Sequence, residues 1–442
     1  MRKGPFRLNF FINRVTNDLR VGFLIRPLII ALLIGAAGMY LSTLEEWYPN
    51  MRGWIPTMLF PTTEDPAVAQ LVLSNIATAM MTVVSIVFAI LLMTLTLAST
   101  QFSPRIIISF VRDRVTQQTL GIFLGTFLYC LGSLPAARNF PTAFCPVVTV
   151  FGAMVLAFLC VTWLLFFIIH ISKAVSVTHL VDRIARETED MIVQTLPEMR
   201  TNSEPVQKTV SPSHLEKGEI PVLSETSGYI LSIDNSKLFT IAKSNNIAIY
   251  VTRRIGHFVP AGIPLMGITG KEKLTPDLER ALKNAFNIGS TRTLDEDIEF
   301  GILQIVDIGL KAVSAASNDP STAINCIDQL SSILIRFAMH RAPKTEFYYP
   351  ENTLRLIVPW LGFDRILESA FEQIRLYSQA DVAVSLRLLR AFSDIASTLP
   401  DKESRKLLVE QGIRLVNGCS EKLAEEVLKE MHSRLAALEK MA

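Results

Sequence analysis

Residues 66–104 read PAVAQLVLSNIATAMMTVVSIVFAILLMTLTLASTQFSP, a run of 39 residues without a charged side chain. Between its first and last prolines the run contains neither glycine nor proline, so nothing inside it marks a turn. A helix of about 20 apolar residues crosses the hydrocarbon core of a bilayer, and spanning backbone must form helices or a closed barrel. The run therefore predicts one long transmembrane helix.

Three further uncharged runs lie on either side of this segment, namely Pro27–Leu44, Val115–Ala137 and Asn139–Ser172. Residues 1–173 contain only 18 of the 84 charged residues of the chain, whereas the remainder has the charge content of an ordinary water-soluble protein. We therefore expect an α-helical integral membrane protein, with four transmembrane helices in a membrane domain over residues 1–173 and the lipid bilayer as its partner.

Basic residues flank alternate ends of the predicted spans. They gather in the N-terminal arm, in the loop at 105–114 and after the fourth span at 173–186, whereas the other two loops contain only Arg52 and Arg138. Loops rich in lysine and arginine stay in the cytoplasm. The pattern predicts a multi-pass protein with cytoplasmic N- and C-termini.

The remaining sequence predicts a cytoplasmic α+β domain. Its expected parts are a connecting amphipathic helix at 174–199, a linker at 200–219, a small β-rich unit resembling a barrel at 220–270 and a helical cytoplasmic region at 271–442. Short β segments with turn residues characterise the third part, and apolar residues at helical spacing characterise the fourth.

Small and hydroxylated residues recur along the second span at steps of three and four. The candidate stripe comprises Thr78, Thr82, Ser85, Thr96, Ser99 and Ser103. Such a stripe is typical of close helix packing in membranes. It would equally line a narrow polar path between several copies of the helix. The spacing leaves both interpretations open.

The third span begins with Gly121 and Gly125, a GxxxG pattern that lets two helix backbones approach closely. This helix packing can lie within the chain or between subunits. No Asp, Glu, Lys or Arg lies inside a predicted span, and His170 near the end of the fourth is expected to be a hydrogen-bonded or interfacial histidine. Four slender spans have little interior, so a path would require a homo-oligomer.

Acidic residues cluster at 295–299, with Asp319 some twenty residues later. Asp295, Asp297, Glu299 and Asp319 could hold a divalent ion, but helix capping explains them better, because Asp319 precedes Pro320 at a helix start. No catalytic motif is present, so we expect no enzyme, no metal and no cofactor. The net charge of +2 excludes a nucleic-acid partner that would need a dense basic face.

Several motifs occur in the order found in one bacterial family. They are Ser99–Arg105, Leu120–Tyr129, Arg292-Thr293 with Asp297 and Phe300-Gly301, Val306–Ile308, Asn318–Pro320 and Thr322-Ala323, together with Ser227–Tyr229 and the turn at Gly256–Leu265. From the first span to about residue 340 the chain resembles the bacterial membrane proteins grouped as domain of unknown function 2254. The resemblance implies a bacterial inner (plasma) membrane protein with a cytosolic domain, and transfers no substrate or catalytic residue.

Two functions follow as hypotheses. The first is an oligomeric channel or transporter-like protein with a cytoplasmic regulatory domain, whose second span lines the path. The alternative is a membrane-anchored sensor or scaffold that binds a partner or small ligand through its cytoplasmic domain.

Overall fold

The computed structural model describes residues 25–48, 50–51, 65–101, 113–138, 144–197, 219–270, 273–294, 296–350 and 352–442. The chain divides into two compact units, a first unit at Met1–Ser176 and a second unit at Val177–Ala442. Ser103 and the predicted linker up to residue 218 lie outside the described residues.

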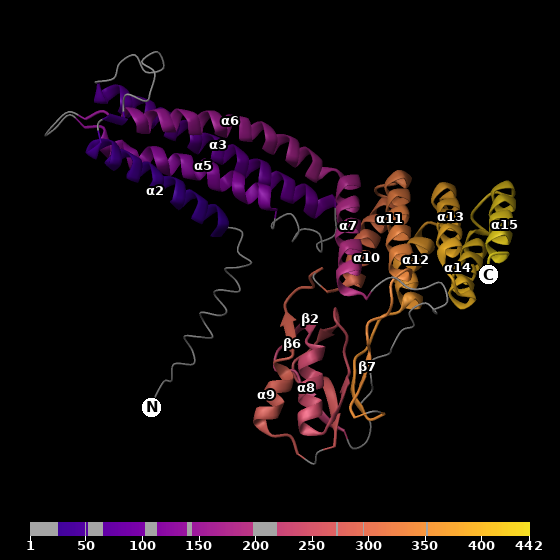
Figure 1. Ribbon diagram of the computed structural model, residues 1–442. Helices are drawn as coiled ribbons and strands as arrows, with labels where there is room; N and C mark the ends of the chain where they lie inside the picture. The colour runs from indigo at the N-terminus through magenta and orange to yellow at the C-terminus, as the bar shows by residue number, and fades with distance from the viewer. Residues whose placement is uncertain are drawn as a thin grey trace. The chain divides into compact units, whose positions relative to one another are not determined.

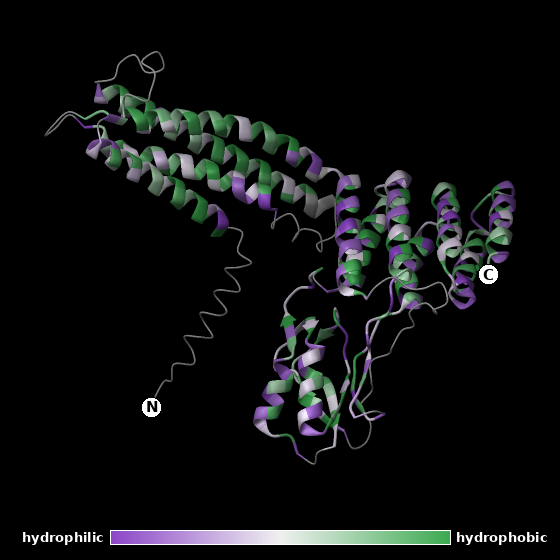
Figure 2. Ribbon diagram, in the orientation of Figure 1, coloured by the Kyte–Doolittle hydropathy of each residue, from purple (hydrophilic) through white to green (hydrophobic). Residues whose placement is uncertain are grey.

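Four long apolar helices form the first unit (Figure 1). They are α2 (Ile25–Trp47), α3 (Pro66–Gln101), α5 (Arg114–Ser133) and α6 (Val147–Val175). Each is long and apolar enough to cross a membrane, and their ribbons are mostly hydrophobic in Figure 2. The four predicted spans are therefore confirmed as helices. Residues 66–101 form one uninterrupted helix, because no residue in this run breaks the backbone hydrogen-bond ladder.

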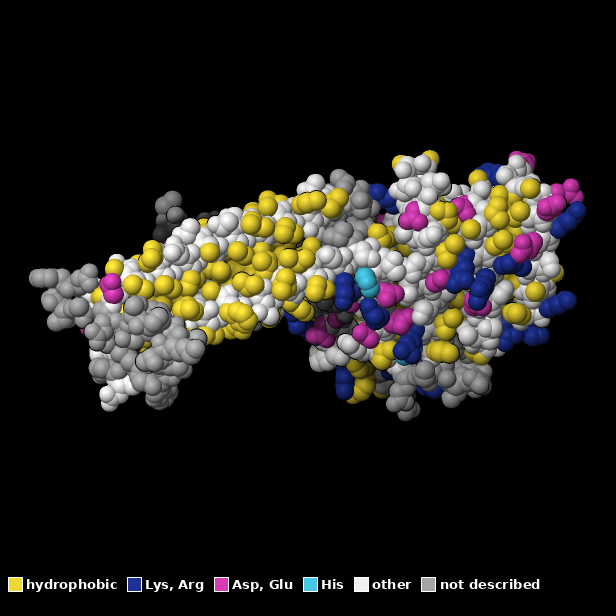
Figure 3. Space-filling model, turned by 90° about the horizontal axis from the view of Figure 1, so that it is seen from above, with side chains coloured by type: hydrophobic (Ala, Val, Ile, Leu, Met, Phe, Trp, Pro, Cys, Tyr) yellow, Lys and Arg dark blue, Asp and Glu magenta, His cyan; other side chains and the backbone are white. Residues whose placement is uncertain are grey.

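Small residues set the packing of the first unit. Gly35 of α2 lies against Leu128 of α5, and α5 also packs against α3 and α6. Large side chains such as Phe123 and Phe167 are fully buried in the interior. The outward surface is apolar over much of the face seen in Figure 3, whereas charged side chains are frequent on the second unit. This distribution is typical of a lipid-solvated helix bundle.

The end of α2 carries a buried carboxylate. Glu45 is 0% exposed, and its two carboxylate oxygens accept hydrogen bonds from the backbone N–H groups of Val148 (3.0 Å) and Thr149 (3.1 Å) at the start of α6. These donors have no partner within their own helix, and the positive end of the helix dipole favours the negative charge. Glu45 therefore ties the end of α2 to the start of α6.

The expected connecting helix does not continue the fourth span. Ser176 has extended backbone angles (φ −69°, ψ 121°) and ends α6, after which α7 (Val177–Thr195) begins. The apolar face of α7 includes the buried Leu180, Val181 and Ile184, and it packs against two later helices of the second unit, α10 and α11. An amphipathic helix is stable only when its apolar face is covered, and here the covering comes from within its own unit.

The strands form two sheets. Their members are β1 (Ile220–Leu223), β2 (Gly228–Ile233), β3 (Ala248–Val251), β4 (Phe258–Val259), β5 (Pro264–Thr269), β6 (Phe286–Gly289), β7 (Glu346–Tyr348) and β8 (Leu354–Ile357). One sheet has the order β1-β5-β3-β8-β7 and the other β4-β2-β6. Two helices, α8 (Asn235–Asn245) and α9 (Pro276–Lys283), accompany them.

The expectation of a small barrel is wrong for the described residues, whose strands leave both sheets open. The reason is that three strands come from later sequence. β6 pairs with β2 in antiparallel orientation, with Gly289 opposite Tyr229. The β7–β8 hairpin extends the other sheet, because β8 pairs in parallel with β3 and Leu356 lies opposite Ile249. Pairing between segments 100 residues apart leaves no trace in local periodicity. The region at 271–442 is expected to be helical apart from one β-leaning segment at 346–358. The strands β7 and β8 lie in that segment, whereas β6 lies where no strand is expected.

The remaining chain forms a two-layered helical array. Its helices are α10 (Ile298–Val313), α11 (Pro320–Ala338), α12 (Phe363–Tyr377), α13 (Val382–Thr398), α14 (Lys402–Cys419) and α15 (Glu425–Glu439). In one layer α12 contacts α10 and α14; in the other α13 contacts α11 and α15 (Figure 1). Asp297, Asp319, Asp381 and Asp401 cap four of these helices. Such polar caps before apolar periodic segments are local signals of helix starts, and the start expected at Asp319–Pro320 is confirmed.

Candidate functional site

The hydroxyl stripe of α3 is saturated within its own helix. Thr78 donates to the carbonyl oxygen of Ser74 (2.9 Å), Thr82 to that of Thr78 (3.1 Å), Ser85 to that of Met81 (2.9 Å) and Thr96 to that of Leu92 (2.8 Å). All four donors are exposed within the first unit. For Ser99 the structure describes the helical backbone only, and Ser103 lies outside the described residues.

The stripe lies opposite the face with which α3 packs in its own chain. At about 3.6 residues per turn, a separation of nine residues places two side chains on opposite sides of a helix. Ala69 and Val87, nine residues before and after Thr78, are both 0% exposed and belong to the packed face. The side chains of Thr78, Thr82 and Ser85 therefore lie on the side of α3 that faces away from its packed face.

The two glycines of the GxxxG pattern lie where α5 meets α2. A Cβ atom at Gly121 would stand 2.9 Å from Cβ of Ile30 and 3.1 Å from Cα of Pro27. One at Gly125 would stand 2.8 Å from Cδ1 of Ile34. These distances are shorter than ordinary carbon contacts. Gly121 and Gly125 thus lie in a close contact within the chain.

His170 has a partner that the sequence did not indicate. Its Nε2 atom lies 3.0 Å from Oδ2 of Asp113, the residue that caps the N-terminus of α5. The two residues are 57 positions apart, so spacing alone could not pair them. The only sequence signal at Asp113 is that it precedes an uncharged run. That signal predicts a helix cap and not a histidine partner.

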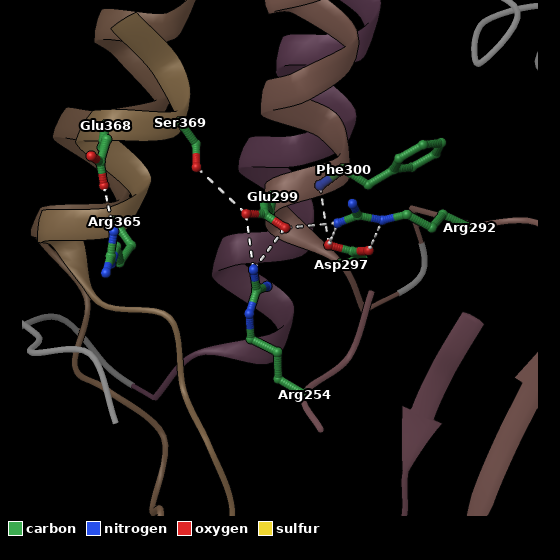
Figure 4. A network of polar contacts seen from close by, with 8 residues as sticks. All are labelled: Arg254, Arg292, Asp297, Glu299, Phe300, Arg365, Glu368 and Ser369. Atoms are coloured by element: carbon green, nitrogen blue, oxygen red, sulfur yellow. Dashed lines mark hydrogen bonds and ion pairs between the residues drawn. The ribbon is translucent and has the colours of Figure 1, made fainter. Parts of the chain in front are cut away.

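The second unit contains a network of four charged side chains (Figure 4). Arg292 contacts both oxygens of Asp297, with its Nε atom 2.7 Å from Oδ2 and its Nη2 atom 2.8 Å from Oδ1. Its Nη2 atom also lies 3.0 Å from Oε2 of Glu299, whose two oxygens accept from Nη2 of Arg254 at 3.0 Å each. The network joins the β-rich part to the start of α10. All four side chains are mostly buried, with exposed fractions of 5–17%.

The charges of this network hold the Glu299 carboxylate ionised. Burial would raise the pKa of the Glu299 carboxyl, but the hydrogen bonds and charges of Arg254 and Arg292 outweigh it and keep that pKa below its ordinary value. Asp297 also accepts from the backbone N–H of Phe300 and so caps α10. Asp297 is thus an N-cap, in agreement with the capping interpretation, whereas the ion pairs of Glu299 were not predicted.

The other members of the acidic candidate set lie elsewhere. Asp319 accepts hydrogen bonds from the backbone N–H and the hydroxyl of Thr322, which makes it the N-cap of α11. Asp295 lies outside the described residues. Within the described ranges no group of three His, Cys, Asp or Glu side chains is arranged to hold a metal ion.

His257, beside the network, predicts a dependence of stability on pH. Burial, followed by the charge of Arg254, lowers its pKa from 6.5 to about 4, and Glu299 only partly opposes this. Between pH 6.5 and 4 the unfolded chain therefore binds a proton that the folded chain does not, so stability falls as the pH falls through this window. His257→Asn should remove the uptake of about one proton on unfolding.

The measurement is urea unfolding of the full chain in detergent at several pH values, followed by Trp360 fluorescence in a background lacking the three other tryptophans. His432→Asn, at an exposed histidine of α15, is the matched control. Equal pH slopes for both variants would contradict the assignment to His257.

A cavity of about 210 Å³ adjoins the network. Its lining includes Arg254 and Glu299, Lys344 just before β7, and the apolar side chains of Trp360, Leu361 and Ile366. Because these residues come from the β-rich part, the β7–β8 hairpin and α12, the cavity exists only where distant segments of the second unit meet. No sequence pattern could have located it.

The family model described as "Predicted membrane protein (DUF2254)" matches residues 20–394. The chain belongs to this family. The resemblance drawn from its motifs is thus confirmed, and the match continues beyond residue 340 into α13. Among DUF2254-type relatives, uncharacterised proteins of Mycobacterium bovis and Mycobacterium tuberculosis are each 31% identical over 359 residues, covering 79% of this chain and 68% of the relative.

No solved structure shows significant similarity to this DUF2254 protein. Its family description and its four apolar helices agree that it is a membrane protein. The mycobacterial relatives bring no activity to it, because they are themselves described only as uncharacterised.

Proposed function

We propose that this DUF2254 protein is an oligomeric channel or transporter-like protein, in which the α3 stripes of several copies line a polar path. The observation that carries the proposal is the orientation of Thr78, Thr82, Ser85 and Thr96 away from the packed face of α3. Hydroxyls exposed on this side of α3 among the described residues are available to other copies of the chain. Hydroxyl oxygens that donate to their own helix retain lone pairs that can replace part of a solute's water shell.

The proposal places the protein in the bacterial inner membrane with both termini cytoplasmic, because basic residues flank the corresponding ends of the spans. The second unit then acts as a cytoplasmic regulatory domain. The proposed function involves no catalysed reaction and no cofactor.

Blocking the stripe tests the path. Thr78→Phe and Thr96→Phe should each reduce solute flux through reconstituted protein by roughly tenfold, because a bulky ring replaces a hydroxyl in a narrow constriction. Flux of potassium ions, chloride and glycerol is measured in proteoliposomes under voltage and osmotic steps. The matched control is Thr162→Phe, at an exposed threonine of α6 whose hydroxyl also bonds to its own helix.

Two flux results would overturn the path. One is the absence of flux from the unmodified protein under every condition, and the other is equal flux through the Thr78, Thr96 and Thr162 variants. A monomer by light scattering in detergent would equally contradict it, since a path between copies needs several of them.

The cavity of the second unit supports a second candidate function, a membrane-anchored sensor or scaffold that binds a small ligand or partner. A cavity at the meeting point of two substructures is the usual place for a ligand that changes their relative arrangement. A rise in the melting temperature of the full chain on ligand binding would support this function.

A further inference from the structure

We propose that the cavity of the second unit binds a small amphipathic organic anion, a carboxylate with a planar apolar body. This inference rests on the second proposed function and names the ligand class for it. The cavity combines available positive charge, internally neutralised acids and an aromatic wall.

Arg254 and Lys344 supply hydrogen-bond donors to the cavity, and Lys344 also supplies a positive charge that the network does not use. Arg254 uses only Nη2 in its two hydrogen bonds to Glu299, which leaves donors on the rest of its guanidinium group. Lys344 is exposed at the cavity, with its Nζ atom 5.1 Å from the ring centroid of Phe347. Across the described part of the chain no carboxylate forms an ion pair with Lys344. A carboxylate at this position would gain charge-assisted hydrogen bonds from both side chains.

The acids of the lining compete little with such a ligand. Asp297 and Glu299 each contact Arg292, and Glu299 contacts Arg254 as well, so their charges are compensated within the protein. Glu296 has an interaction of its own. The positive charge of Lys344 therefore faces the cavity without a matching negative charge from the network.

The apolar side chains that line the cavity favour a flat apolar ligand body. Trp360 lies nearly parallel to Phe337, with an interplanar angle of 11° and a centroid separation of 6.3 Å, which holds its indole ring in place. Leu361 and Ile366 extend the apolar surface. The volume of 210 Å³ is below the roughly 300–1,000 Å³ of sites for drug-sized ligands, so a single aromatic ring with a short acidic arm suits it.

Asn235 adds a polar contact at the same site. It lines the cavity, and its side-chain oxygen is shielded from solvent and has no hydrogen-bond partner among the described residues. Buried polar atoms in folded proteins are nearly always paired. An aromatic carboxylate that also carries a hydrogen-bond donor, such as a hydroxyl group on its ring, would satisfy this oxygen.

Phenylacetate is the test ligand, and phenylacetamide and acetate are its matched controls. Trp360 is the only tryptophan within residues 177–442, so its fluorescence reports on the cavity when the other three are replaced by phenylalanine. We expect phenylacetate to change this fluorescence saturably and to raise the melting temperature of the full chain in detergent. Phenylacetamide lacks the charge and acetate lacks the ring, so both should bind at least roughly tenfold more weakly.

Charge variants separate this site from nonspecific binding. Lys344→Gln should weaken phenylacetate binding about tenfold, whereas Lys406→Gln, at an exposed lysine of α14, should leave it unchanged. Equal binding of acid and amide, or equal binding by both variants, would overturn the inference. Binding of neutral indole or phenylethylamine without phenylacetate would refute the ligand class but keep the sensor function. Binding of none of these probes would count against both.

Discussion

Replacing Arg292 with methionine is expected to lower the free energy of unfolding of the second unit by about 3–5 kcal/mol. Arg292 contacts both Asp297 and Glu299, and its side chain is only 14% exposed. Removing it leaves Asp297, which is 5% exposed, without its two short contacts in a poorly solvated position. The cost comes from the unpaired buried charge, which exceeds the net contribution of the pair itself.

Urea unfolding of the full chain in detergent, followed by Trp360 fluorescence, measures this loss. The matched control is Arg365→Met, which breaks the contact between Arg365 and Glu368 shown beside the network in Figure 4. That arginine is 61% exposed, so its removal should cost less than about 1 kcal/mol. Arg292→Lys should fall between the two, because it keeps the charge and loses the planar fork. If Arg292→Met and Arg365→Met lowered the free energy of unfolding by similar amounts, burial of the network would not explain its contribution to stability.

Replacing Gly125 with leucine should destabilise the first unit by about 3 kcal/mol, corresponding to a fall in melting temperature of about 6–12 °C. Even a Cβ atom at this position would lie 2.8 Å from Cδ1 of Ile34 and 3.3 Å from Cα of Ala31. The second contact involves backbone, so α2 and α5 would have to move apart. Alanine normally favours a helix over glycine, yet Gly125→Ala should also destabilise, because the contact outweighs the propensity.

Melting in detergent, read as the fraction of monodisperse protein on size-exclusion chromatography, gives the comparison. Ala36→Leu adds bulk at an exposed position of α2 and should leave the melting temperature nearly unchanged. Should Gly125→Leu melt at the same temperature as Ala36→Leu, the close contact between α2 and α5 would not contribute to stability.

The helices of this protein were largely predictable because their signals are local. Uncharged runs located all four apolar helices, and a capping aspartate placed the starts of α10 and α11 within one residue. The sheets were not predictable to the same extent. Individual strands such as β2 and β8 fell where β-type segments were expected, but their pairing joins segments that lie far apart in the chain.

The candidate sites divide in the same way. Helical spacing identified the stripe of Thr78, Thr82, Ser85 and Thr96, but not whether it faces a neighbouring helix or the outside of the chain. Asp297 and Glu299 were identified from the acidic cluster, whereas Arg292 entered only as part of a family resemblance. Arg254, which completes the network, could not be predicted, because no motif in the sequence around it requires a charged side chain.

The amino-acid sequence by itself determined that this protein has four apolar helices long enough to cross a membrane, a separate charge-rich part and membership of one family. These properties depend on the composition of a segment and on the spacing of its residues, both of which are present in the chain before it folds. Only the tertiary structure decided that the stripe faces outward, that late strands complete early sheets, and that four charges and a cavity meet beside α10. Such properties depend on contacts between residues that can be more than 100 positions apart, and these exist only once the chain has folded.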